Sequence, residues 1–262
     1  HQVEIICPNI KMEDECDEIF GIKIWYFSFP YGFLDPLFLN GIRSHGKLDT
    51  FKTYFAEVKP DIVHFHGIYP HFYFFIKTLT DELQLPCLVT PHLINFICPN
   101  GTLKQNNNNR DCNGKVALFK CTYCIYSKSD GVKGHFPKIF SLSSVFLFKI
   151  IFINKFRSKI KFLSTTFSVY SKATFLKFIS SRIHFDALNC WFAKVLEKNY
   201  ISQDNVSVYS NPIFEKENFL LNKNENGCPQ KGLKLLFVGR LSFDKGINVL
   251  LDSLQLNSDF KD

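Results

Sequence analysis

The sequence predicts an α/β protein built around a parallel sheet. Strand-like and helix-like segments alternate along most of the 262 residues, as they do where helices connect parallel strands and cover both faces of a sheet. Two of the predicted strands, Asp61–Gly67 and Pro86–His92, are short apolar runs with polar ends that include His64, His66 and His92. Because ligands bind at the carboxyl ends of such strands, we expect a functional site there.

The remaining elements are predicted from local patterns. The Lys59-Pro60 pair ends the helix predicted over Leu48–Val58, because proline disfavours helical backbone in the residue before it. Strands are predicted at 1–7, 22–27, 186–191 and 205–214, and further helices from 71 and over 193–199. Residues 99–114 form a polar loop that contains a run of asparagines.

Residues 131–185 carry ten basic side chains and no acidic one. Apolar residues recur within this segment at helical spacing and are predicted to form one helical face: Phe148, Phe152, Phe156, Ile160, Leu163 and Phe167. One interpretation is a core-facing helix with a solvated opposite side, and the other is an amphipathic surface that binds anionic lipid. A nucleic-acid partner is not expected, because no nucleic-acid-binding motif accompanies the charge.

Nine cysteines are too few for a disulfide scaffold in a chain of this length, and their odd number leaves at least one unpaired. They therefore favour a reducing compartment. Cys98, Cys112, Cys121 and Cys124 follow the pattern C-x13-C-x8-C-x2-C. These four thiols could hold a structural zinc ion that orders the polar loop. Free thiols and ordinary packing are the alternatives.

The C-terminal region begins after a polar segment at 215–232, which glycine and proline mark as a linker. A strand is predicted from Leu233, followed by Gly239-Arg240, four residues, Lys245-Gly246 and a helix. Two cations beside the free N–H groups of a helix start suit a diphosphate. The alternative is a surface turn whose arginine and lysine are solvated.

Four segments together resemble the retaining GT-B glycosyltransferases of family 4. They are PDIVHFHG (60–67), VTPHLINFICPNGT (89–102), VSVYSNPI (206–213) and LLFVGRLSFDKGINVLLDSL (235–254). The resemblance implies a GT-B fold. It would comprise a Rossmann-like acceptor-side domain over 1–214, the linker at 215–232, and the first β-α unit of a second Rossmann-like, donor-binding domain over 233–262.

The resemblance also implies the site and its chemistry. Arg240 and Lys245, flanked by Gly239 and Gly246, would bind the donor diphosphate, and Arg240 and Lys245 would stabilise the leaving group. His92 would reach the transferred sugar, and His66 and Asn95 are candidates on the acceptor side. The implied reaction moves a sugar from a nucleoside diphosphate, with retention, to a cell-surface polysaccharide, lipopolysaccharide or lipid-linked glycan. It requires no cofactor.

Two motifs of the family have no counterpart in this chain. The glycine-rich loop would precede His1, and the Glu-x7-Glu motif would follow Asp262. We therefore expect a fragment truncated at both ends, with little activity of its own. The expected location is the cytoplasm, with peripheral contact at the inner face of the plasma membrane. The alternatives are a membrane-associated or zinc-stabilised interaction module without catalysis, and a nucleotide-sugar epimerase on a similar fold.

Overall fold

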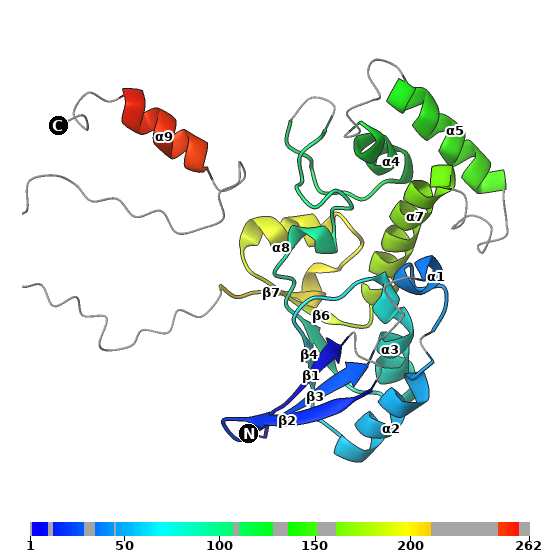
Figure 1. Cartoon of the computed structure of the whole chain (residues 1–262), viewed down its shortest axis with the longest axis vertical. Coiled ribbons are helices and arrows are strands. Elements are labelled where there is room, and N and C mark those ends of the chain that lie inside the picture. The colour runs from blue at the N-terminus through cyan, green and yellow to red at the C-terminus, as the bar shows by residue number, and fades with distance from the viewer. Residues whose placement is uncertain are drawn as a thin grey trace, which may run out of the picture. The chain divides into compact units, whose positions relative to one another are not determined.

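The computed structural model of the chain describes residues 2–9, 13–28, 35–44, 46–106, 110–127, 136–150, 161–210 and 246–256. The protein is a mixed α/β structure (Figure 1), as the sequence predicts. The chain divides into two units, His1–Asn211 and Pro212–Asp262. The described part of the second unit is α9 (Ile247–Leu256) and the preceding Gly246.

A four-stranded parallel sheet lies in the first unit. Its order is β4 (Val63–Phe65), β5 (Cys87–Val89), β6 (His184–Ala187) and β7 (Val206–Val208). Residues of the two central strands are fully buried, which fits short apolar strands covered on both faces: Val89, Phe185 and Ala187.

The strand predicted over 186–191 is wrong in its bounds. β6 begins and ends earlier in the chain, and α8 (Cys190–Glu197) follows it after two residues. The Asn189 side chain accepts a hydrogen bond from the backbone N–H of Phe192 at 2.8 Å. This N-cap starts the helix where the apolar pattern alone suggests a continuing strand.

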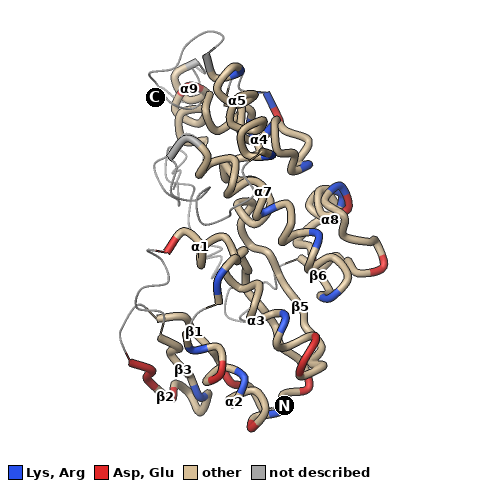
Figure 2. The backbone as a smooth tube through the Cα atoms, turned by 90° about the vertical axis from the view of Figure 1, so that its right-hand side faces the viewer, with Lys and Arg blue, Asp and Glu red and all other residues tan. Residues whose placement is uncertain are grey.

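A second sheet contains β1 (Glu4–Asn9), β3 (Ile22–Ser28) and β2 (Glu15–Ile19), in that order. β1 and β3 are parallel, whereas β2 and β3 form an antiparallel hairpin. The hairpin turn is Phe20-Gly21, and both residues have positive φ, 54° and 78°. The sequence did not predict β2, because all five of its residues are exposed and three are acidic (red in Figure 2).

Aromatic side chains pack α2 (Leu48–Val58) and α3 (Tyr73–Lys77) against this second sheet. Phe51 of α2 lies 5.9 Å from Phe27 of β3 and 4.6 Å from Phe75 of α3, measured between ring centroids. α2 has the predicted bounds. The helix predicted from His71 is instead three short pieces: η2 (Pro70–Phe72), α3 and the π-turn η3 (Thr78–Glu82).

Three helices pack on one another beyond the sheets: α4 (Leu118–Tyr126), α5 (Phe136–Ile150) and α7 (Lys161–Ile179). The prediction of one helical face from Phe148 to Phe167 is wrong, because α5 and α7 lie side by side. Phe148 and Phe167 are 6.3 Å apart, whereas 19 residues of one straight helix span about 28 Å. Phe152, Phe156 and Ile160 lie outside the described residues.

The side chain of Asn199 ties the segment before α4 to α8. Its amide donates to the carbonyls of Gly114 and Val195, and its oxygen accepts from the N–H of Val116 at 2.8 Å. Asn199 is 1% exposed. Gly114 has φ +80°, and a Cβ there would lie 2.5 Å from Val195 Cγ1. The close approach of backbone to helix therefore requires glycine at 114.

The described helices include none that is long and apolar enough to cross a membrane.

We predict that Asn199→Leu lowers the free energy of unfolding by about 2–4 kcal/mol, because it leaves buried backbone groups without partners. Denaturant unfolding followed by circular dichroism measures the loss. Asn40→Leu is the control, since the Asn40 amide makes an exposed bond to the Pro36 carbonyl. Equal effects of the two substitutions would contradict the role given to Asn199.

Candidate functional site

Two histidines meet at the carboxyl edge of the parallel sheet. His66 follows β4, and His92 lies shortly after β5. The Thr90 N–H donates to the Phe65 carbonyl at 2.9 Å, which extends the pairing of the two strands to their ends. His66 Nδ1 lies 2.9 Å from His92 Nε2, and the rings are nearly parallel at 6°. Both side chains are exposed, so a ligand at this edge can reach them.

His64 extends this group along β4. Its Nε2 lies 2.8 Å from the hydroxyl of Thr90, and its ring centroid is 4.4 Å from that of His66. Desolvation lowers the pKa of His64, and the neighbouring His66 lowers it further, whereas Asp186 raises it. The structure thus brings together the three histidines that the sequence placed at this edge.

Asn95 connects the histidines to a second group of polar side chains. It lies in the short turn η4 (Ile94–Phe96), three residues after His92. Its side-chain oxygen accepts from the Tyr69 hydroxyl at 3.3 Å, and its backbone carbonyl accepts from the Lys172 ammonium of α7. Burial lowers the pKa of Lys172 to about 8, and the thiols of Cys98 and Cys121 act in the opposite direction.

Tyr69 and Lys172 also line an open cavity of about 320 Å³. His71 and Ser168 contribute further polar groups to its wall. Desolvation lowers the pKa of His71 to about 4, so its imidazole is neutral at pH 7. Its ring stacks on that of Tyr69, with centroids 5.7 Å apart. A neutral imidazole, a phenol and an ammonium are hydrogen-bonding groups suited to a hydroxyl-rich ligand.

The sequence did not indicate Tyr69, His71 or Lys172 as site residues. Lys172 is one of ten basic residues in its segment, and only the packing of α7 distinguishes it. His71 stands among aromatic residues in a segment predicted as an ordinary helix. Thr90 could have been identified from the sequence, because it lies at the polar end of the strand predicted over Pro86–His92.

The donor-side residues expected from the sequence fall almost entirely outside the described part of the chain. Gly239, Arg240 and Lys245 are not among the described residues. Gly246 is described. It has φ +75°, and its carbonyl accepts from Leu250 N–H at 3.1 Å in the first turn of α9. The expected helix therefore starts directly after the expected glycine.

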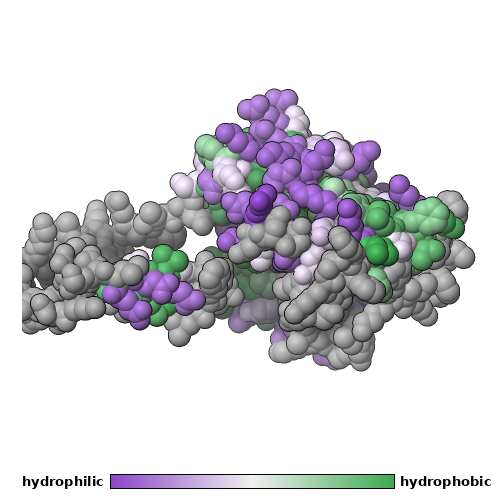
Figure 3. Space-filling model, turned by 90° about the horizontal axis from the view of Figure 1, so that it is seen from above, coloured by the Kyte–Doolittle hydropathy of each residue, from purple (hydrophilic) through white to green (hydrophobic). Residues whose placement is uncertain are grey.

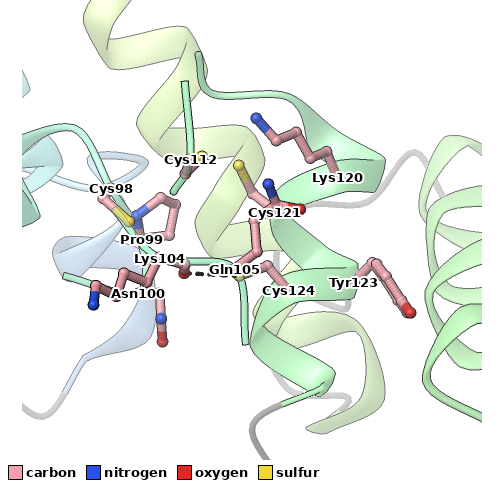
Figure 4. A pocket seen from close by; sticks show the side chains of 10 residues that line it. All are labelled: Cys98, Pro99, Asn100, Lys104, Gln105, Cys112, Lys120, Cys121, Tyr123 and Cys124. Carbon is pink, nitrogen blue, oxygen red and sulfur yellow. Dashed lines mark hydrogen bonds between the residues drawn. The ribbon is translucent and has the colours of Figure 1, made fainter. Parts of the chain in front are cut away.

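The four cysteines line a separate cavity of about 40 Å³ between the polar loop and α4 (Figure 4). Cys98, Cys112, Cys121 and Cys124 are all free thiols. Among the described residues, no group of three or more His, Cys, Asp or Glu side chains is already arranged to hold a metal ion.

Comparisons of the chain with protein-family models, with curated proteins and with solved structures find no match.

We predict that the stability of the protein rises with pH between about 4 and 6.5 because of His71. Its pKa is lower in the folded protein than the ordinary 6.5, so the unfolded chain binds more protons in that window. His71→Phe removes this contribution, which is at most about 1.4 kcal/mol per pH unit.

Urea unfolding of wild type and His71→Phe across this pH range tests the prediction. The difference in unfolding free energy, wild type minus variant, should increase as pH rises. His66→Phe, which replaces an exposed imidazole, is the control. A difference that does not change with pH would contradict the assignment.

Proposed function

We propose that the chain belongs to a retaining, sugar-nucleotide-dependent glycosyltransferase of the GT-B type, with its first unit on the acceptor side. The observation that carries the proposal is the pair of hydrogen-bonded imidazoles, His66 and His92, at the carboxyl edge of a parallel sheet. This edge is where α/β proteins bind their ligands. The motif resemblance of the sequence supplies the reaction class.

His92 has a partner that fixes its ring. With His66 Nδ1 at 2.9 Å from His92 Nε2, one nitrogen donates and the other accepts. The remaining nitrogen of His92 is then available to a sugar hydroxyl. In this scheme His92 orients the transferred sugar, and it transfers no proton in the rate-limiting step.

The acceptor would occupy the open cavity beside Asn95. Tyr69, His71 and Lys172 line it with groups that can donate or accept hydrogen bonds, and sugar hydroxyls do both. The acceptor class we propose is a cell-surface polysaccharide, lipopolysaccharide or lipid-linked glycan, made in the cytoplasm. A nucleotide-sugar epimerase would use the same diphosphate-binding residues but would not need an acceptor cavity.

The donor diphosphate would be bound by the segment from Gly239 to Gly246. The start of α9 directly after Gly246 supports this, since the N–H groups of the first helical turn favour an anion. Arg240 and Lys245 would supply the fixed positive charge that stabilises the leaving diphosphate. This scheme requires no metal ion.

We predict that Arg240→Ala with Lys245→Ala weakens sugar-nucleotide binding at least tenfold. The reason is that each cation forms a charge-assisted bond with the diphosphate. The measurement is equilibrium binding of a panel of uridine-, guanosine-, adenosine- and thymidine-diphosphate sugars to the protein. Lys194→Ala with Lys198→Ala, on and just after α8, is the matched control.

His92→Gln should leave this binding unchanged and reduce sugar transfer or donor hydrolysis about 100-fold. The proposed function fails if no sugar nucleotide of the panel binds at millimolar concentration. It also fails if the Arg240 and Lys245 variant binds like the control.

A second candidate function, contact with an anionic membrane, is favoured by the exposed apolar side chains of α5. Ile139, Leu142, Phe146 and Ile150 are 52–66% exposed. A hydrophobic cluster lies on the side of the molecule where Figure 1 has α5 (green in Figure 3). Lys138 and Lys149 lie on the same helix, and residues 131–185 contain no acid. Such a helix binds at the interface of an anionic bilayer, here the inner face of the plasma membrane.

We predict that Phe146→Glu reduces co-sedimentation with vesicles containing anionic lipid about tenfold, because it places a charge on the apolar face of α5. Phe20→Glu is the control, since Phe20 is 100% exposed at the distant β2–β3 hairpin. Wild-type protein should also bind less to neutral vesicles than to anionic ones, and less when salt is added. Equal binding of the two variants would exclude α5 as the membrane contact.

A further inference from the structure

Four thiols from three separate segments face the same small cavity. Cys98 follows the turn η4, Cys112 lies near the end of the polar loop, and Cys121 and Cys124 lie one turn apart on α4. The sulfur atoms point into the space between the loop and α4 (Figure 4). The cavity of about 40 Å³ exceeds the roughly 10–15 Å³ that a single water needs. The space therefore suffices for one ion.

Backbone hydrogen bonds hold the segments that carry the thiols. The Cys98 N–H donates to the Ile94 carbonyl at 2.8 Å, and the Cys112 N–H donates to the Leu103 carbonyl at 2.7 Å. These bonds fix both sides of the loop. The Asn106 amide then donates to the Cys124 carbonyl at 2.7 Å, which joins the loop to α4. The convergence of the four thiols is thus a property of the fold.

The surroundings of the cavity carry positive charge. Lys104 and Lys120 line it, and none of the described residues that line it is acidic. The ammonium of Lys172 interacts electrostatically with Cys98 and Cys121 from the side of α7. Four thiolates around a divalent cation carry a net charge of about −2. The lysines would offset that charge.

Cys121 and Cys124 differ from typical reactive cysteines. Burial raises the pKa of Cys121, and it also raises the pKa of Cys124. Reactive cysteines have a lowered pKa, so the shifts of these two thiols are in the opposite direction.

We propose that Cys98, Cys112, Cys121 and Cys124 bind one zinc ion as a tetrahedral structural site. Zinc prefers four thiolates at about 2.3 Å in such sites. The thiols are not yet at ligand distance, so binding rotates their side chains toward the centre of the cavity. Each thiol that binds loses its proton to solvent, and affinity therefore falls as pH falls.

Existing contacts are compatible with this rearrangement. The Ala117 N–H already donates to Cys121 Sγ at 3.4 Å, and such a bond strengthens when the sulfur becomes a thiolate. Cys124 gives up only a weak contact of 3.7 Å with the Lys104 carbonyl. The closed site would fix residues 94–98, which follow His92. The proposed zinc site does not depend on the proposed sugar transfer.

The test is metal analysis of the protein purified under reducing conditions and desalted. We expect one zinc per chain in the wild type and less than a tenth of that in Cys121→Ser with Cys124→Ser. The matched control, Cys16→Ser with Cys190→Ser, replaces two exposed cysteines outside the cavity and should keep one zinc per chain.

A second measurement does not depend on whether the variant folds. Wild-type protein stripped of metal by a chelator is titrated with Co²⁺, and the thiolate-to-cobalt absorption should saturate at one ion per chain. Added Zn²⁺ should abolish this absorption by displacing the cobalt. The site is refuted if neither ion binds, or if the Cys121 and Cys124 variant retains zinc. Iron with acid-labile sulfide, or disulfides among the four cysteines, would also refute it.

Discussion

The ammonium of Lys172 links α7 to the segment that both candidate sites share. It leaves α7 and bonds to the carbonyl of Asn95, in the turn after β5. Burying a lysine is unfavourable, and the lowered pKa of Lys172 reflects that cost. In return, the bond from α7 helps to fix the segment that runs from His92 to Cys98. The bond adds to the contacts that already hold this segment, which are the His66–His92 hydrogen bond, the Tyr69–Asn95 hydrogen bond and the burial of Phe96 and Ile97.

The two sites are chemically distinct although they share this segment. The histidine edge is exposed, and the open cavity, which Tyr69, His71 and Lys172 line, offers hydrogen-bonding groups of both kinds. The cysteine cavity is small, and sulfur and lysine dominate its lining. An open polar surface suits a ligand that enters and leaves, whereas a small cavity lined by thiols suits a permanently bound ion.

The strands and helices that follow a simple period were predictable from the sequence. The helix over Leu48–Val58 has a clear amphipathic pattern and a Lys-Pro end, and its bounds agree with the structure. β2 was not predictable, because an exposed edge strand buries no side chain and shows no alternation. The apolar spacing from Phe148 to Phe167 led to a wrong prediction, since two helices that pack on each other can share one periodicity.

The candidate site was predictable only in part. Polar ends of predicted strands pointed to His64, His66 and His92, because strand ends in a parallel sheet share one edge. Tyr69, His71 and Lys172 belong to the same region through tertiary contacts that leave no mark on local pattern. The cysteine spacing indicated a cluster, but only the fold of the loop brings Cys112 back toward Cys98.

The acidic strand at the margin of the second sheet also affects how this protein behaves among its own copies. β2 pairs with β3 on one side, and its other side has no strand partner in the described sheet. An edge strand of this kind can pair with a strand of another molecule and so begin a fibre. Glu15, Asp17 and Glu18 would meet the same charges on an approaching copy, and their repulsion helps to keep the molecules apart.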